Sequence, residues 1–521
     1  MEFSKLGRNN ILNQSLLSYD IIIIGGGITG AGILLDATNR GLKAILLEKN
    51  DFASGTSSKS TKLIHGGLRY LKNLEFGLVR EVGLERAVLY NNALHIIHPE
   101  KMLLPIVQNG TLGMKSSALA LFTYDYLAGV SDKDKKKMLT KKQVVGLEPL
   151  INEEILLGGA LYTEYRCDDY RIVMEVLKKA VSLGGVAINY AEVIDFIYEN
   201  TICKGVKIED RLTNTIKTIH GKIIINATGP WVDDLRVIDK SKNGKQLHLT
   251  KGIHIVVNHS KLPIKQSIYF DTKDDRMIFA IPRNGIVYIG TTDTDFDKDK
   301  DNINVSVEDK TYLINAIQNV FPGIAIDLSD IVAEWAGLRP LIHEEGKNPS
   351  ELSRKDEIFI APSKMVSIAG GKLTGYRKMA EKVVDGSMKK LKKYYQYPFK
   401  PCTTKYLKLS GGDFLNEKAF AIYKLHILDI VKQIPYTEKQ VLNLVYRYGS
   451  NTEQIVTMAY DFVNNGFSPQ TALLQAEVTY CKEYEMVHTF EDFWIRRTGN
   501  DWFFKNDYEQ FIPLIKQWIE A

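Results

Sequence analysis

The sequence predicts an α/β protein in which a largely parallel sheet is combined with an inserted antiparallel sheet and a helical C-terminal domain. Three observations lead to this fold class. Near the N-terminus a strand, a glycine-rich turn and a helix follow one another; two later segments repeat this order; and segments between them alternate like antiparallel strands. A chain of 521 residues is too long for one hydrophobic core, so two or three structural units are expected.

The parallel sheet is predicted from the strand–turn–helix units. Residues 19–24 are almost entirely apolar, as a strand buried on both faces requires, and the helix after them is expected to end at Gly41. A second strand is expected at residues 44–47. Residues 222–234 and 365–385 each combine a short apolar strand, a turn with glycine and a helical pattern. These units predict one sheet assembled from segments that lie far apart in the sequence.

Other segments predict the antiparallel sheet and the helical domain. Residues 249–259 and 276–295 alternate or run apolar, and Asn284-Gly285 is typical of a hairpin turn. Residues 389–405 are marked by lysine and proline, and helical patterns dominate after them. The last domain is therefore expected to begin at about Cys402.

Composition restricts the classes of protein. Hydrophobic residues make up 45% and charged residues 25%, which is typical of a soluble globular protein. The 67 basic and 62 acidic residues leave a net charge of +5, so no nucleic-acid partner is expected, while an anionic substrate or membrane surface is compatible. The four cysteines lack CxxC spacing, which argues against a zinc site or a disulfide scaffold and favours a reducing cytosol. No metal is expected.

A glycine motif lies between the first strand and the first helix. Gly25, Gly27 and Gly30 have the Gly-x-Gly-x-x-Gly spacing, which brings backbone amides at a helix N-terminus close to a pyrophosphate and lets helix and strand pack closely. Glu48 ends the second strand, where a carboxylate accepts hydrogen bonds from a ribose hydroxyl. Together these features predict dinucleotide binding in a Rossmann-like domain.

The choice between NAD and FAD needs further features, because the fingerprint serves both. Thr56, Ser57 and Ser58 suit a second set of pyrophosphate or ribityl contacts, although composition alone favours a solvated loop. From about Tyr19 to Val384 the chain resembles the FAD-dependent glycerol-3-phosphate dehydrogenases, within the wider D-amino-acid-oxidase-like flavoprotein group. The motifs in matching order are IIIIGGGITGAGILLDA, TSSKSTKLIHGGLRYL, INATGPWVDD, KGIHIVV, IGTTDTD, AGLRPL and GGKLTGYRKMA.

The resemblance implies FAD as the cofactor and assigns residues to it. The glycine turn and Glu48 would hold the ADP half, and backbone amides at a later helix start would stabilise negative charge on the reduced ring. The Gly371-Lys372 pair is no phosphate-binding loop, because Leu373 stands where Ser or Thr is required. The implied cofactor residues are Gly25, Gly27, Gly30 and Glu48; Thr56 and Ser57; Thr228 and Gly229; and Gly370, Gly371, Leu373 and Thr374.

The order of these segments predicts how the domains alternate along the chain, and the helical C-terminal extension also suits the family. A leader precedes the oxidoreductase region, and the helical domain follows it. The expected ranges are 1–18 for the leader, 19–400 for the oxidoreductase region and 402–521 for the helical domain, with FAD-binding segments at about 19–95, 155–245 and 335–395 and substrate-domain segments at about 96–154 and 246–334.

The implied substrate, sn-glycerol 3-phosphate, has a dianionic head, and arginine has the fork that best matches phosphate oxygens. Arg339 is the first candidate, because the proline after it stiffens the backbone. Arg69 and Arg354 are candidates for a second contact, and Lys372 for the hydroxyl end. A surface ion pair is the alternative for any one of these arginines.

Oxidation of the C2 alcohol removes a hydroxyl proton while a hydride passes to the flavin, and histidine is the side chain with a pKa near neutrality. Two histidines lie in the matching motifs. His65 is favoured as the base, because it neighbours Arg69 and the Gly66-Gly67 pair that lets the backbone approach a ring. His254 is the alternative; a histidine on such an apolar strand is more often a core residue.

Residues 116–142 join an apolar, aromatic stretch to several lysines. This pairing suits an anionic membrane surface, and a buried helix followed by a solvated loop explains it equally well. The sequence contains no stretch of about 18 uncharged apolar residues, so no transmembrane helix is expected. The lysines are Lys133, Lys135, Lys136, Lys137, Lys141 and Lys142.

The expected function is therefore FAD-dependent oxidation of sn-glycerol 3-phosphate to dihydroxyacetone phosphate in glycerol catabolism, with electrons passed to a membrane quinone. The protein is expected in the cytoplasm, peripheral on the inner face of the cell membrane, and as a homodimer. One alternative is a glycerol-3-phosphate oxidase that produces hydrogen peroxide. Others are an FAD-dependent amine oxidase relative or a flavin-bound interaction protein.

Overall fold

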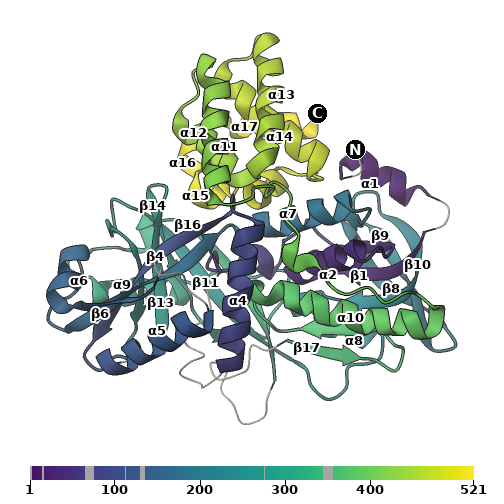
Figure 1. Ribbon diagram of the computed structural model, residues 1–521, viewed down its shortest axis with the longest axis horizontal. Coiled ribbons are helices and arrows are strands. Elements are labelled where there is room, and N and C mark those ends of the chain that lie inside the picture. The colour runs from purple at the N-terminus through teal and green to yellow at the C-terminus, as the bar shows by residue number, and fades with distance from the viewer. Residues whose placement is uncertain are drawn as a thin grey trace.

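The described part of the computed structural model comprises residues 3–14, 17–64, 76–111, 113–128, 135–274, 276–343 and 356–521. Two sheets lie next to each other, and the C-terminal helices form a further layer above them (Figure 1). This arrangement confirms the expected fold class, a nucleotide-binding α/β domain with an antiparallel-sheet domain and a helical C-terminal domain.

The first sheet has a parallel core in the order β18-β10-β1-β2-β7, with antiparallel strands at its margins. Ile24 pairs with Asn226 on one side and with Leu47 on the other, so the carboxyl ends of β1, β10 and β2 meet at one edge. The expectation of one sheet built from separated segments is confirmed. Its strands are β1 (Ser18–Ile24), β2 (Ala44–Leu47), β7 (Val186–Ile188), β8 (Ala191–Glu199), β9 (Ile202–Asp210), β10 (Thr215–Asn226), β17 (Glu357–Ile360) and β18 (Val366–Ala369).

The second sheet is largely antiparallel and runs in the order β15-β11-β14-β13-β12-β4-β6-β3, with β16 beside β11 and β5 beside β6. The predicted hairpin joins β13 to β14, and Asn284 and Gly285 have φ of 51° and 82°, as a type I′ turn requires. The strands are β3 (Leu63–Ile64), β4 (Ile97–Val107), β5 (Lys137–Thr140), β6 (Leu156–Cys167), β11 (Leu247–Asn258), β12 (Ser267–Asp271), β13 (Met277–Arg283), β14 (Ile286–Gly290), β15 (Thr294–Asp295) and β16 (Ile331–Ile342).

The sheet boundaries differ from the expected segments at β6 and β16. Both strands lie in the second sheet, because β6 pairs with β4 and β16 pairs with β11 along most of their lengths. The expected FAD-binding segments began near residues 155 and 335, so they included β6 and the end of β16. An apolar strand pattern does not show which sheet a strand joins, and this explains the difference.

Helices cover the parallel sheet and build the upper layer. Close packing of α2 against α10 depends on Gly32, where a Cβ would lie 2.6 Å from the Tyr376 ring. The helices below the upper layer are α1 (Lys5–Leu12), α2 (Ile28–Asn39), α4 (Phe76–Asn92), α5 (Met114–Ala128), α6 (Lys141–Leu147), α7 (Asp169–Ser182), α8 (Val232–Ile238), α9 (Val307–Val320) and α10 (Tyr376–Tyr395).

The C-terminal helices have their own core, separate from the sheets. Buried Leu444, Ile455, Leu474 and Trp494 form part of it, and a capping box at Thr437 fixes the start of one helix. Its elements are α11 (Glu417–Ile430), α12 (Glu438–Tyr448), α13 (Thr452–Asn464), α14 (Pro469–Tyr484), a π-helical segment (Asp492–Arg497), α15 (Asn500–Phe503), α16 (Lys505–Tyr508) and α17 (Ile512–Glu520).

The segment before β1 forms α1, which packs on the first sheet. Ser4 accepts a hydrogen bond from the Gly7 amide and caps the helix. The buried Arg8 guanidinium pairs with Asp210 at 2.6 Å and donates to the Asn189 carbonyl. Among the helices that the structure describes, none has both the length and the apolar character needed to cross a bilayer.

Candidate functional site

A cavity of about 560 Å³ lies where the two sheets meet. Its volume is within the range of about 300–1,000 Å³ that is usual for ligand pockets. Turns at the carboxyl ends of β1, β2, β10 and β18 line one side, and residues of β11 and β16 line the other. The cavity therefore lies where a parallel α/β sheet usually binds its ligand.

The β1–α2 turn brings backbone close to the cavity, as the glycine motif predicts. Gly25 has φ of 112°, and a Cβ there would lie 2.6 Å from the Ala227 carbonyl oxygen. A Cβ at Gly30 would lie 1.9 Å from the Gly25 carbonyl oxygen, so this glycine permits close contact of helix and turn. Gly25 and Gly27 line the cavity, whereas Gly30 packs behind it.

Glu48 lies at the end of β2 and lines the cavity. Its carboxylate accepts hydrogen bonds from the Gly26 amide at 2.6 Å and from the Asn50 amide at 2.9 Å. Burial raises the pKa of this carboxyl, against the effect of the two amides. The carboxylate is thus fixed beside the glycine turn, where the motif predicts a ribose contact.

Residues 50–62 are called the wall segment below, because Asn50, residues 54–57 and residues 59–61 form one wall of the cavity. The Ser57 hydroxyl accepts a hydrogen bond from the Ile28 amide in the first turn of α2, at 3.0 Å. The Thr56 hydroxyl donates to the Leu338 carbonyl of β16, at 2.7 Å. The wall segment therefore connects the start of the nucleotide-binding helix to the second sheet.

Two further turns of the first sheet reach the cavity. Thr228 and Gly229 follow β10, and the Thr228 hydroxyl donates to the Asn226 side chain at 2.7 Å. Asn226 in turn donates to the Val232 carbonyl, so it holds this turn together. The turn after β18 contributes the remaining predicted residues, Gly370, Gly371, Lys372, Leu373 and Thr374.

One face of the second sheet forms the opposite wall. Along β11 this face carries Thr250, Gly252 and His254, which pair across the strands with Arg339, Gly337 and Trp335 of β16. Alternate residues of a strand share a face, so the glycine pair makes a hollow between the arginine and the histidine. A Cβ at Gly252 would lie 2.2 Å from the Arg339 guanidinium, which occupies that hollow.

The Arg339 guanidinium is held by the turn after β14. It donates to the Thr291 hydroxyl at 2.8 Å and the Thr292 carbonyl at 3.1 Å, and it pairs with Asp293 at 3.2 Å. Its side chain keeps 20% exposure. Arg339 is therefore a fixed cation at the cavity wall, suited to an anionic ligand.

His254 lines the same wall and is buried. Its ring stacks on Trp335 with 4.7 Å between centroids, and its Nε2 lies 3.0 Å from the Thr61 hydroxyl. Burial, together with the charges of Arg339 and Lys62, holds the pKa of the imidazole well below its usual range. The ring is neutral at physiological pH, so it can accept a proton.

The described cavity brings together most of the predicted site residues. Lys372, Arg339, His254 and, apart from Gly30, the predicted cofactor residues line it. His65, Arg69 and Arg354 lie outside the described residues. The structure therefore places one of the two candidate bases and one of the three candidate arginines.

Sequence reasoning missed the residues that orient Arg339 and His254. Thr61 and Trp335 contact the histidine, and Thr291 and Asp293 contact the arginine. Trp335 directly precedes the AGLRPL motif, and the two others at the arginine belong to the IGTTDTD motif. The motifs gave the positions, but the cross-strand register that assigns these contacts comes only from the structure.

The cavity thus combines a nucleotide-binding edge of a parallel sheet with an arginine and a neutral histidine on the opposite wall. Residues 20–364 match the family of FAD dependent oxidoreductases, and the chain belongs to this family. Residues 402–519 match the C-terminal domain of alpha-glycerophosphate oxidase. The family and the FAD cofactor that the sequence predicts are thereby confirmed.

Relatives with known names agree with this assignment. The aerobic glycerol-3-phosphate dehydrogenase of Staphylococcus aureus (strain USA300) is 49% identical over 498 residues, which cover 95% of this chain and 89% of the relative. The solved glycerol-3-phosphate dehydrogenase of Bacillus halodurans, complexed with FAD, has a TM-score of 0.83 and 41% identity, over 99% of this chain and 93% of that one. An L-alpha-glycerophosphate oxidase from Mycoplasma pneumoniae, at 18% identity and a TM-score of 0.57, covers 71% of this chain and 94% of its own and shares the fold.

The residues present fit FAD. Gly27 leaves space in the glycine turn, because a Cβ there would lie only 3.1 Å from the Ser57 hydroxyl. The first backbone amides of α2 follow directly after this glycine. Glu48 supplies a half-buried acceptor beside this turn. The predicted flavin-side turn, residues 370–374, borders the same cavity.

Proposed function

We propose that this protein oxidises sn-glycerol 3-phosphate to dihydroxyacetone phosphate in glycerol catabolism and passes the electrons to a membrane quinone. The observation that carries the proposal is the wall formed by β11 and β16, on which the pair that contains Arg339 and the pair that contains His254 share one face with the Gly252–Gly337 pair between them. The names of the relatives from Staphylococcus aureus and Bacillus halodurans support the substrate.

The proposed roles follow from the chemistry of the substrate. FAD, when bound, supplies the acceptor for the hydride from C2. Arg339 binds the phosphate, because its guanidinium fork is fixed by Thr291 and Thr292 before the ligand arrives. Arg69 and Arg354 are proposed for the second phosphate contact, and Lys372 for the hydroxyl end.

A neutral histidine accepts the hydroxyl proton in this proposal. His254 has the supporting geometry, since its ring lines the cavity and is oriented by Trp335 and Thr61, and a neutral imidazole has one ring nitrogen that can accept a proton. His65, favoured on sequence, is the other candidate. If flavin reduction stays fast after His254 is replaced, His65 is the residue that accepts the hydroxyl proton.

Turnover of the purified holoenzyme tests the substrate and the acceptor together. sn-Glycerol 3-phosphate, glycerol and glycine are each offered with a soluble quinone, and then with oxygen alone. We expect quinone reduction with the phosphate ester and little with the other two, because glycerol has no anion for Arg339 and glycine has no secondary alcohol to oxidise. Oxidation of glycine in its place would show an amine oxidase.

A glycerol-3-phosphate oxidase is the second candidate, and one observation favours it. The C-terminal residues 402–519 match a domain described from alpha-glycerophosphate oxidase. An oxidase would form hydrogen peroxide in amounts equal to the substrate consumed, with oxygen as the acceptor. A low peroxide yield with fast quinone reduction supports the dehydrogenase.

Quinone reduction requires contact with a membrane, and we propose α5 as the contact, with the protein peripheral on the inner face of the cell membrane. Leu119 is 68% and Phe122 62% exposed on α5, and Lys115 is exposed beside them. Lys136 lies over the Phe122 ring at 4.8 Å. Apolar side chains next to lysines are typical of contact with anionic lipids.

Sedimentation with vesicles tests this contact. Leu119→Asp and Phe122→Asp are expected to lower the bound fraction on vesicles with anionic lipid, while turnover with a soluble quinone stays unchanged. Leu415→Asp, at another exposed apolar position, is the control. Equal binding by all three variants would remove α5 from the proposal.

We also propose that the protein forms a homodimer. Light scattering of the purified protein measures its mass in solution.

A further inference from the structure

The helical C-terminal domain contacts the wall segment at both of its ends. We propose that Arg496, Arg497 and Trp502 of this domain are positioning residues for FAD, which hold the wall segment in the shape that binds the cofactor. The inference rests on FAD occupying the cavity, as the family implies, and not on the identity of the substrate.

The first contact is at Asp51, near the beginning of the wall segment. Its carboxylate and the Arg497 guanidinium are both fully buried, and they form two hydrogen bonds of 2.7 and 2.8 Å. Arg496 adds a third bond at 2.6 Å, and Asn189 a fourth at 3.1 Å. Asp51 follows Glu48 closely in the chain, so the helical domain fixes the backbone next to the predicted ribose contact.

The second contact is at the other end of the wall segment. The ammonium group of Lys62 lies 4.3 Å from the Trp502 ring centroid, and that of Lys59 lies 5.0 Å from it. Lys62 also donates to the Ser58 carbonyl and to Asp169, both at 2.7 Å. Trp502 therefore packs against the cations that fold the end of the wall segment around Ser58.

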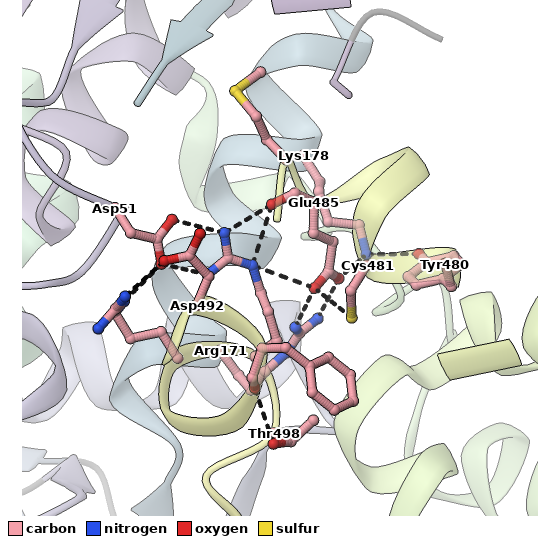
Figure 2. A network of polar contacts seen from close by, with 12 residues as sticks. Asp51, Arg171, Lys178, Tyr480, Cys481, Glu485, Asp492 and Thr498 are labelled. Carbon is pink, nitrogen blue, oxygen red and sulfur yellow. Dashed lines mark hydrogen bonds and ion pairs between the residues drawn. The ribbon is translucent and has the colours of Figure 1, made fainter. Parts of the chain in front are cut away.

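A third set of contacts fixes the helix that carries Asp169. Asp169 begins α7 and accepts hydrogen bonds from the amide and the hydroxyl of Ser60, at 3.0 and 2.6 Å. Further along α7, Arg171 forms two hydrogen bonds, of 2.7 and 2.8 Å, with Glu485 of the helical domain (Figure 2). Arg497 donates to the Glu485 carbonyl, which joins this contact to the first one.

These contacts act on the cofactor through the residues between them. Ser57 accepts from the Ile28 amide at the start of α2, and Thr56 donates to β16. Both are predicted FAD neighbours, and both lie between Asp51 and Lys62. A fork-to-carboxylate pair fixes direction as well as distance, so loss of Arg497 frees the beginning of this segment.

The physical consequence is a change in cofactor affinity. A buried ion pair is weak evidence for stability, because desolvation offsets the attraction between the charges. The pair also fixes the orientation of the Asp51 side chain, and through it the shape of the wall segment. If the FAD-competent shape of the wall segment falls to about a tenth of the population, the Kd for FAD rises about tenfold.

The test compares two buried arginines of the helical domain. Arg497→Gln removes the pair with Asp51, and Arg447→Gln removes the buried pair with Glu477 inside the helical domain. The Kd for FAD is measured on dilution of each holoenzyme, from the recovery of free flavin fluorescence. The thermal unfolding temperature of each variant is measured in parallel, and neither measurement uses substrate.

We expect Arg497→Gln to raise the Kd for FAD about tenfold or more, and Arg447→Gln to lower the unfolding temperature with an unchanged Kd. If Arg497→Gln and Arg447→Gln have the same unfolding temperature and the same Kd for FAD, the proposal is overturned. If Arg497→Gln does not fold, Arg496→Gln and Trp502→Leu replace it, since Arg496 keeps 15% exposure and leaves Arg497 paired. An unchanged Kd in both of these variants would also overturn it.

Discussion

Arg339 and His254 show how a site is made from alternate residues of paired strands. Each side chain has a cross-strand or turn partner that fixes it, Trp335 for the histidine and Thr291 for the arginine. The two groups differ in charge because burial keeps the imidazole neutral, whereas the guanidinium stays charged. A permanent cation and a neutral base therefore lie on one wall.

Arg339→Ala is expected to lower kcat/KM for sn-glycerol 3-phosphate while FAD stays bound. Loss of a charged pair with phosphate costs about 2–5 kcal/mol, which corresponds to about 30- to 4,000-fold. Steady-state kinetics with a soluble quinone measures the effect. Arg166→Ala, at an arginine of β6 paired with Glu100, is the control. A wild-type kcat/KM in Arg339→Ala would remove this residue from the phosphate site.

His254→Asn is expected to slow reduction of the bound flavin by about 10²- to 10⁴-fold, the usual contribution of a positioned base. Stopped-flow absorbance with excess substrate measures this step directly. His259→Asn serves as the control, because His259 is partly buried in the turn directly after β11 and contacts the Ile264 carbonyl. Fast flavin reduction in His254→Asn would assign the proton to His65.

At the scale of elements, the sequence predicted individual strands and helices well and their partners poorly. The strand at residues 44–47 and the Asn284-Gly285 hairpin agree with the structure, because local periodicity and turn chemistry determine them. The placement of β6 and β16 in the second sheet depends on pairing between distant residues. Periodicity contains no information about such pairing.

Gly252→Ala tests the register of β11 and β16. The new Cβ would lie 2.2 Å from the Arg339 guanidinium, so the guanidinium must move out of its hollow. We expect a raised KM for sn-glycerol 3-phosphate, about tenfold or more, with FAD retained, since a small misplacement of a binding group is costly. Gly323→Ala, where a Cβ meets open space, is the control. Equal KM values in the two variants would contradict the geometry.

At the scale of the whole molecule, buried ion pairs join the helical domain to the cofactor side of the fold. Asp51 and Arg497, which form one of these pairs, are far apart in the sequence. The residues around them show no motif that predicts this contact. The sequence predicted a helical C-terminal domain, and it predicted the residues at the glycine turn. It could not predict the contacts at Asp51 and Glu485, because charged residues are ordinarily exposed.

These pairs make stability depend on acid pH. Burial would raise the pKa of Asp51 and of Glu485, but the charges of Arg497 and Arg496 and those of Arg171 and Lys178 outweigh it and hold both pKa values well below the usual range. The unfolded chain therefore binds more protons than the folded one as the pH falls. This stabilisation is fully present above about pH 5 and is lost as the pH falls through the folded values.

We expect the unfolding temperature of the wild-type holoenzyme to fall steeply below about pH 4, with release of flavin. Differential scanning fluorimetry over a pH series, read with flavin fluorescence, measures both. Asp51→Asn removes one of these carboxylates, so its unfolding temperature is expected to be lower at neutral pH and to change less with acid. An unaltered acid slope in Asp51→Asn would contradict this account.

The central claim is that sn-glycerol 3-phosphate reduces the flavin bound between the two sheets. The most direct test is anaerobic addition of this substrate to the purified holoenzyme, with the absorption of oxidised flavin recorded. The account predicts that the oxidised-flavin band bleaches with sn-glycerol 3-phosphate and does not bleach with glycerol. A flavin that stays oxidised at saturating sn-glycerol 3-phosphate, yet is reduced by dithionite, would contradict it.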